Sequence, residues 1–284
     1  MKIYDRKTKT YEDIVQYGAG KLDFLYNNPI GRIFLGIAVS PFVSNIYANK
    51  NSRKSSVKKI PGFIADNKIN MNDYIDKEYR SFNDFFIREL KPGKRPVDMS
   101  KDALIAPCDS KLLVYEIGKD TSMRIKGRTY TADEILDDAE NAKEFSGGYA
   151  LVFRLTVDDY HRFSYPDRGC VISRRMIRGK LHTVSPVSKN HKIYVENTRQ
   201  VNMLKTENFG NVAYIEVGAM LVGRIVDKGI DVFDKGQEKG YFEPGGSTVV
   251  ILVNNVKIDK DIMEQSESGI ETKVRLGERI GRAL

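Results

Sequence analysis

The chain has 284 residues, enough for one large domain with a buried core or for a core with a smaller appendage. Its 46 Lys and Arg exceed its 38 Asp and Glu, and the formal charge of +8 is compatible with nucleic acid, anionic lipid or acidic substrates as partners. Its two cysteines, Cys108 and Cys170, exclude a disulfide framework, and its three histidines stand at no ligand spacing, so we expect no metal site. The polar first residues do not have the pattern of a secretory signal peptide.

Residues 33–47 are uncharged and largely apolar. They are too few to span a membrane, which takes about 20 apolar residues, and Gly36 and Pro41 would kink or break a helix. A basic cluster follows, with no acidic residue before Asp66: Lys50, Arg53, Lys54, Lys58 and Lys59. This pattern is typical of a segment lying in the interface of an anionic bilayer, and a core helix followed by a solvated loop produces the same pattern.

Apolar residues at helical spacing predict a helix within residues 69–90, ended by Pro92, with Ser81 and Asp84 placed as a capping box. A second capping box, Thr131 with Glu134, predicts a helix near residues 132–142. Beyond residue 96 the pattern favours strands, at residues 112–117, 149–157, 193–196, 212–217, 221–226 and 247–253.

These elements predict an α+β fold. We expect residues 1–92 to form a helical region that contains the apolar segment and residues 93–284 to form a β-rich core. The polar tail after Asp261 is placed to cap that core.

Three short patches carry candidate reactive groups, each at the end of a predicted strand: Asp109 beside Cys108, His161 beside Arg162, and Ser247. A serine nucleophile needs a base, and a histidine base is usually oriented by a carboxylate. Taken singly, such an aspartate is most often a turn residue and such a histidine most often a loop or core residue.

Ser247 stands at a turn-to-strand junction in Glu243-Pro244-Gly245-Gly246-Ser247-Thr248. The two glycines leave the backbone unshielded and free to adopt positive φ, so the Gly246 carbonyl is open to attack by the Ser247 hydroxyl. Because most Gly-Gly-Ser sequences are only turns, this stretch gains a functional meaning from the rest of the chain.

Two other classes of function have weaker support. A cysteine hydrolase would use Cys108 with His161 as base, but Asp109 would raise the pKa of the thiol. A nucleic-acid binder would pair basic residues with exposed aromatic ones, and the run of Arg174, Arg175, Arg178 and Lys180 has no aromatic platform. We therefore expect no nucleic-acid partner.

Taken together, the patches resemble the phosphatidylserine decarboxylase family over about residues 70–255. The matching motifs follow the family's order: residues 81–88 (SFNDFFIR), Pro107-Cys108-Asp109, Asp159-Tyr160-His161-Arg162-Phe163, Val217-Gly218-Ala219, Lys235-Gly236-Gln237-Glu238-Lys239-Gly240-Tyr241-Phe242 and Gly245-Gly246-Ser247-Thr248-Val249. The last motif is similar to the bacterial form with Gly-Gly-Ser-Thr in place of Leu-Gly-Ser-Thr.

The resemblance implies that the chain cuts itself between Gly246 and Ser247. Ser247 Oγ would attack the Gly246 carbonyl to give an ester, loss of the α-proton would expel that ester, and hydrolysis of the dehydroalanine would leave a pyruvoyl group and ammonia. The products would be a β-chain of residues 1–246 and an α-chain of residues 247–284. The covalent pyruvoyl group would be the only cofactor, acting as the electron sink when phosphatidylserine loses CO₂ to become phosphatidylethanolamine.

The resemblance also implies roles for individual residues. His161 would return a proton to the product carbon. Self-cleavage in the family uses an Asp-His-Ser triad, to which Asp109 and Ser247 correspond, while the position of the triad histidine holds Ser164. His161 serving both steps and His182 approaching from another strand are the two alternatives for the base.

A lipid substrate favours the membrane interpretation of residues 30–59. The implied location is peripheral, on the cytoplasmic face of the cell membrane, with an anionic lipid surface as partner. A homodimer is one arrangement that the sequence allows. The alternative function is a non-catalytic lipid-binding relative that no longer cleaves itself because of the change at Ser164.

Overall fold

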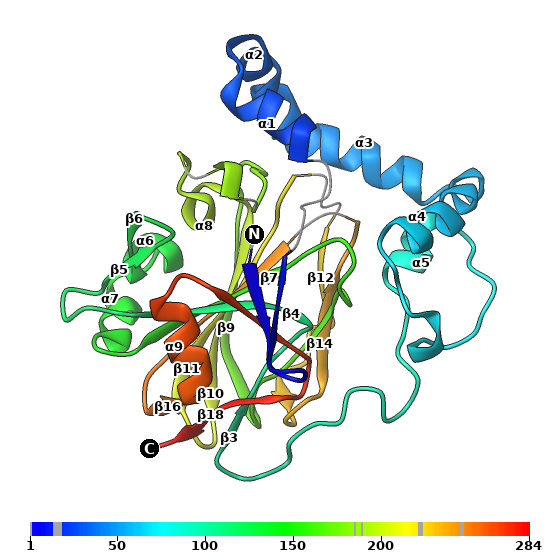
Figure 1. Cartoon of the computed structure of the whole chain (residues 1–284). Helices are drawn as coiled ribbons and strands as arrows, with labels where there is room; N and C mark the ends of the chain where they lie inside the picture. Colours follow the sequence, from blue (N-terminus) through cyan, green and yellow to red (C-terminus); the bar gives the residue numbers. More distant parts are fainter. Residues whose placement is uncertain (1, 14–18, 185, 189, 221–223, 245–246) are drawn as a thin grey trace.

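The computed structural model describes residues 2–13, 19–184, 186–188, 190–220, 224–244 and 247–284 (Figure 1). The α+β prediction is confirmed: helices dominate the first part of the chain and a large mixed sheet follows. The helices are α1 (Ala19–Asn27), α2 (Pro29–Ala38), α3 (Pro41–Asn51), η1 (Lys54–Lys59), α4 (Ile60–Asp66), η2 (Met71–Asp73), α5 (Phe82–Phe86), α6 (Ala132–Leu136), α7 (Ala139–Ala142), η3 (Lys143–Phe145), η4 (Pro186–Ser188), α8 (Ile193–Glu196) and α9 (Lys260–Glu267).

The main sheet has ten strands among the described residues. In spatial order they are β13 (Val232–Phe233), β9 (Gly169–Ile177), β10 (Arg199–Thr206), β11 (Gly210–Val217), β15 (Ser247–Val253), β7 (Tyr149–Leu155), β4 (Ser110–Glu116), β17 (Glu271–Val274), β1 (Lys2–Asp5) and β2 (Thr10–Asp13). Neighbouring strands pair antiparallel, except that β1 runs parallel to β17.

Smaller sheets flank the main one. They are β12 (Ile225–Asp227), β14 (Glu238–Phe242) and β8 (Arg162–Ser164); β16 (Val256–Ile258), β18 (Arg279–Ala283) and β3 (Ala103–Ile105); and the hairpin β5 (Ser122–Ile125) with β6 (Arg128–Thr131).

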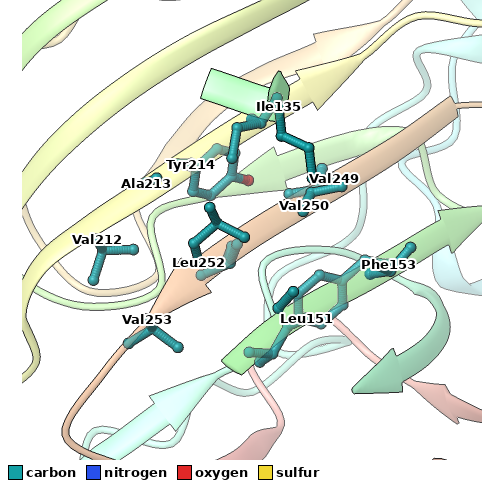
Figure 2. Packing of buried hydrophobic residues seen from close by; sticks show 14 of the residues in the cluster. Ile135, Leu151, Phe153, Val212, Ala213, Tyr214, Val249, Val250, Leu252 and Val253 are labelled. Atoms are coloured by element: carbon teal, nitrogen blue, oxygen red, sulfur yellow. The ribbon is translucent and has the colours of Figure 1, made fainter. Parts of the chain in front are cut away.

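Strand β15 lies in the middle of the main sheet and is buried along its whole length. Its unbroken apolar run follows from that position, because both faces of the strand are covered. Figure 2 shows buried side chains of β15 with those of its two neighbours, and the register pairs Val249 with Phe153 of β7 and Val253 with Val212 of β11. This packing fixes the place where β15 begins, at Ser247.

The first helices project away from the sheet (Figure 1). Asn28 caps α2 and Ser40 caps α3, each cap is followed by a proline, and the two helices meet at a bend of 70°. Among the described helices, no single one has the length and apolar character needed to cross a membrane, whereas the bent pair α2–α3 together meets that criterion.

The predicted helix within residues 69–90 is wrong for most of its length. Only η2 and α5 form, and Tyr74 bridges to Leu90 in extended backbone. The Ser81 hydroxyl does cap α5 by accepting from the Asp84 amide at 3.1 Å, but the Asp84 carboxylate accepts from the Arg80 amide and so closes no capping box. The apolar spacing instead serves a small local core of phenylalanines.

Other boundaries also differ from the predictions. Residues 193–196 form the helix α8 rather than a strand, since four residues carry too little pattern to separate the two. The capping box at Thr131 is present, but Asp137 at φ 53° divides the predicted helix into α6 and α7. The strand predicted at 221–226 is seen only from Ile225, because residues 221–223 lie outside the described residues.

The tail does more than cap the core. Helix α9 packs against β4, but β17 is inserted in the main sheet between β4 and β1. A polar strand can be buried there because Glu271 accepts from Arg154 Nε at 2.8 Å and also pairs with Lys126 at 3.3 Å. The same strand pairs with Ile3, so the start of the chain also belongs to the sheet.

Replacing Glu271 by Ala should destabilise the protein by about 3–5 kcal/mol, because it leaves the buried Arg154 guanidinium without its carboxylate. Urea unfolding at neutral pH measures the loss. The matched control is Asp102→Ala, which breaks an exposed pair with Arg282 and should change stability little. Equal effects of the two substitutions would contradict this account of β17.

Candidate active site

The strand register brings the three sequence patches to one end of the main sheet. Ser247 pairs with Leu155, the last residue of β7, and on the other side of β7 Lys111 pairs with Arg154. Asp109 directly precedes β4, so it lies at the same end as Ser247, roughly 10 Å away at two strand spacings. Pairing of the strands therefore brings together patches that are far apart in the sequence.

Ser247 is fully buried, and its Oγ has no hydrogen-bond partner among the described residues. Leaving a buried hydroxyl unpaired costs about 1–3 kcal/mol, so such a group calls for a functional explanation. The predicted scissile bond joins Ser247 to Gly246, and both Gly245 and Gly246 lie outside the described residues.

His161 lies in the loop that follows β7. Its Nδ1 is 2.9 Å from the Asp159 carbonyl, which can only accept, so Nδ1 carries the proton and Nε2 keeps its lone pair. That Nε2 has no partner among the described residues, and the ring packs on Phe86 with 4.2 Å between centroids. Complete burial lowers the pKa of His161 to about 3, so the imidazole is neutral near pH 7.

The backbone places His161 beside the end of strand β14. The Phe242 amide donates to the His161 carbonyl at 2.9 Å, and Phe242 ends β14 shortly before Ser247. A neutral imidazole with a free Nε2 can accept a proton from a hydroxyl, which is the first requirement for a base in this position.

Two buried cations, whose contacts the sequence did not predict, hold the loop that carries His161 in place. Lys111 donates to both carboxylate oxygens of Asp159 at 2.7 Å. Arg88 is fully buried and donates to the carbonyls of Asp158 and Asp159 at 3.3 and 3.4 Å. Arg88 belongs to a motif that the sequence had singled out, whereas nothing in the sequence marked Lys111.

Asp109 is held by a cation of its own. Arg95 donates to it from Nε at 2.9 Å and from Nη2 at 2.6 Å, and the Leu276 amide donates at 2.9 Å. Within the part of the chain that the structure describes, no hydrogen bond joins Asp109 to His161 or Ser247. Arg95 was also missed, because a basic residue before Pro96 has the pattern of a solvated turn.

Ser164, which the resemblance assigns to the position of the triad histidine, lies on the Asp109 side of the site. Strand β8 holds it against Pro107, whose carbonyl accepts from the Ser164 amide at 2.8 Å and faces Ser164 Oγ at 3.3 Å. The side chain is buried. It thus packs on the turn that carries Asp109, two residues before that aspartate.

His182 lies at the end of β11 nearest Thr248. Asn197 holds its backbone and also donates to the Gly218 carbonyl at 2.8 Å, and the adjoining Val217 pairs with Thr248. Burial and the nearby His191 lower the pKa of His182 to about 4. No hydrogen bond within the described residues connects His182 with Ser247.

The competing functional sites lose support from the geometry. Cys108 is fully buried, and burial raises the pKa of its thiol well above the usual value, which is the opposite of what a thiolate nucleophile needs. In the basic run, Arg174 pairs with Asp231 at 2.6 Å and Arg175 donates to the Leu136 carbonyl at 2.5 Å.

Known proteins resemble this chain along nearly its whole length. A sequence model described as phosphatidylserine decarboxylase matches residues 82–282. Phosphatidylserine decarboxylase proenzyme 2 of Clostridium acetobutylicum is 50% identical over 283 residues, covering 98% of this chain and 97% of the relative. The phosphatidylserine decarboxylase proenzyme of Clostridium perfringens (strain SM101) is 40% identical, covering 99% of this chain and 99% of the relative. That of Fusobacterium nucleatum is 39% identical, covering 99% of this chain and 97% of the relative.

The low pKa of His161 has a direct spectroscopic consequence. Because the neutral form persists down to about pH 3, the ring signals of His161 should not shift between pH 5 and pH 8. Proton NMR of the ring, assigned by comparison with His161→Gln, measures this, and the urea-unfolded chain should titrate near pH 6.5. A titration of the native His161 signal centred above pH 5 would show that the ring is not desolvated.

Proposed function

Because the chain belongs to the phosphatidylserine decarboxylase family, we propose that it converts phosphatidylserine to phosphatidylethanolamine with a pyruvoyl group derived from Ser247. The single observation that carries the site assignment is the buried Ser247 hydroxyl, which has no hydrogen-bond partner among the described residues and stands at the first residue of β15, beside the loop of His161. A pyruvoyl ketone supplies an electron sink for the pair left behind when CO₂ departs.

His161 is the proposed base for self-cleavage. Its Nε2 would take the proton of Ser247 Oγ as that oxygen attacks the Gly246 carbonyl. After cleavage the same Nε2, protonated when an anionic substrate raises its pKa, would return a proton to the product carbon. Two observations support this assignment: Nδ1–H is fixed by the Asp159 carbonyl, and Nε2 has no partner in the part of the chain that the structure describes. His182 is the second candidate for the base.

Asp109 is proposed as a positioning residue on the other side of the site. Its carboxylate is already bound to Arg95, and its turn contacts Ser164 through Pro107. The arrangement supports a role for Asp109 in holding its own turn against β8, the strand that directly follows His161. Lys111 and Arg88 would hold the loop that precedes His161, through Asp158 and Asp159.

After self-cleavage the two products would still share one sheet. The proposed α-chain, residues 247–284, supplies β15 and β17, and each of these strands lies between strands of the proposed β-chain, residues 1–246. Separating the products would expose the apolar core around β15, so we expect them to remain one folded unit.

The test of this function is decarboxylation of phosphatidylserine in detergent micelles, followed by the phosphatidylethanolamine formed. The wild-type chain should be active and Ser247→Ala inactive. His161→Ala should cleave itself at least about 100-fold more slowly, the usual contribution of a positioned base, whereas His182→Ala should cleave at nearly the wild-type rate. The reverse ranking would transfer the role of base to His182, and activity in Ser247→Ala would refute the pyruvoyl assignment. An inactive wild-type chain that stays uncleaved would favour the lipid-binding alternative.

The proposed membrane contact is the outer face of α2 and α3. Ile33 is 73% exposed and Phe42 is 70% exposed, and other large apolar side chains line the same two helices: Ile30, Phe34, Ile37 and Ile46. The surface of a soluble protein rarely has so many large apolar side chains side by side. The basic cluster from Lys50 to Lys59 follows these apolar residues directly in the sequence. We infer peripheral binding to the anionic cytoplasmic leaflet of the cell membrane.

The membrane contact is tested by replacing Ile33 and Phe42 together with serine and measuring sedimentation with vesicles of phosphatidylcholine and phosphatidylglycerol. Binding should weaken at least about tenfold, because two large apolar side chains no longer enter the bilayer. The matched control replaces Ile172 and Met176, which are exposed on β9, and should bind as the wild type does. Equal binding by all three proteins would exclude this face as the contact.

A further inference from the structure

Two histidines and a glutamate gather in the connection between β9 and β10. They are His182, His191 and Glu196, and one potential ligand atom from each lies within 4.8 Å of the other two. None of the three contacts the loop of His161 in any described hydrogen bond. Their spacing along the chain matches no common zinc motif, which is why the sequence led us to expect no metal site.

The two distances from Glu196 to the histidines suit a metal ion. Glu196 Oε2 is 3.5 Å from His182 Nε2 and 3.4 Å from His191 Nδ1. Ligand atoms bound to one tetrahedral Zn²⁺ at about 2.0–2.2 Å stand roughly 3.4 Å apart. The other oxygen of Glu196 accepts from the Lys192 amide at 2.7 Å, which fixes the carboxylate and leaves Oε2 directed at both rings.

His182 supplies an independent indication. Its side chain is only 2% exposed, and Nε2 has no hydrogen-bond partner among the described residues. On the opposite side of the ring, Nδ1 is 3.1 Å from the Tyr26 hydroxyl, which accepts from the Thr183 amide. When Nδ1–H donates to the Tyr26 oxygen, Nε2 keeps its lone pair. A histidine that binds a metal is usually held in this way, by a hydrogen bond from its other ring nitrogen.

His191 is the movable ligand of the three. Its ring stacks on that of His182 with 3.9 Å between centroids and 20° between planes. One ion cannot lie in the planes of two nearly parallel rings, so chelation turns His191 out of the stack. Its side chain is 29% exposed and so has room to turn.

We propose that His182, His191 and Glu196 bind one divalent transition-metal ion of the Zn²⁺ class, with water in the remaining coordination position. Three protein ligands with an open position are a common zinc arrangement. The ion would join α8 to the His182 loop, and through Tyr26 it would hold α1 against the core. With His161 as the base for self-cleavage, the ion would have a structural role apart from the pyruvoyl chemistry.

Titration of the tag-free, chelator-treated full chain with Zn²⁺, followed by calorimetry, tests the proposal. We expect one ion per chain with a dissociation constant of about 1 µM or below. Glu196→Gln and His191→Gln should each weaken binding at least about tenfold, and Co²⁺ should give the strong visible absorption of a four-coordinate site. The control Glu134→Gln removes a carboxylate outside the cluster, which pairs with Lys192 and accepts from the Thr131 amide, and should bind Zn²⁺ as the wild type does.

Two results would overturn the proposal. One is the absence of stoichiometric binding to the wild-type chain. The other is binding that both variants retain, which would place the ion elsewhere. His191→Gln changes a partly exposed side chain, so it keeps the test decisive if Glu196→Gln fails to fold, and circular dichroism checks the fold of each variant.

Discussion

The pairing of β15 with β7 and β11 is the constraint on which the rest of the structure depends. The strand is buried on both faces and along its whole length, so a slip in its register would exchange side chains between two closely packed faces. That register sets Ser247 opposite the last residue of β7, from which the His161 loop departs. The position of Ser247 is therefore fixed by the hydrophobic core.

Buried cations complete the arrangement around this strand. Lys111 and Arg88 bind the loop that carries His161, and Arg154 binds Glu271 of β17. A buried charge is tolerated only when it is paired, so each of these contacts commits two distant segments to one geometry. Because Lys111 and Arg154 are neighbours across β4 and β7, the loop and the tail are held from the same place in the sheet.

The sequence predicted those parts whose signal is local or continuous. The apolar run at 247–253 identified β15, Thr131 with Glu134 identified the start of α6, and the motif residues identified Ser247 and His161 as candidates. Parts determined by tertiary contact were missed. A stretch as short as residues 193–196 does not distinguish a helix from a strand. The polar β17 can be buried in the core because Glu271 accepts a hydrogen bond from Arg154. The partners Arg95 and Lys111 were missed for the same reason, since ion pairs across the fold leave no periodicity in the sequence.

The central claim is that Ser247 begins a new chain after self-cleavage, and the mass of the purified protein under denaturing conditions tests it most directly. The account predicts two species, residues 1–246 and residues 247–284, with the shorter one blocked at its N-terminus by a pyruvoyl group. A single species of full length that persists after long incubation, with Ser247 unmodified, would contradict it.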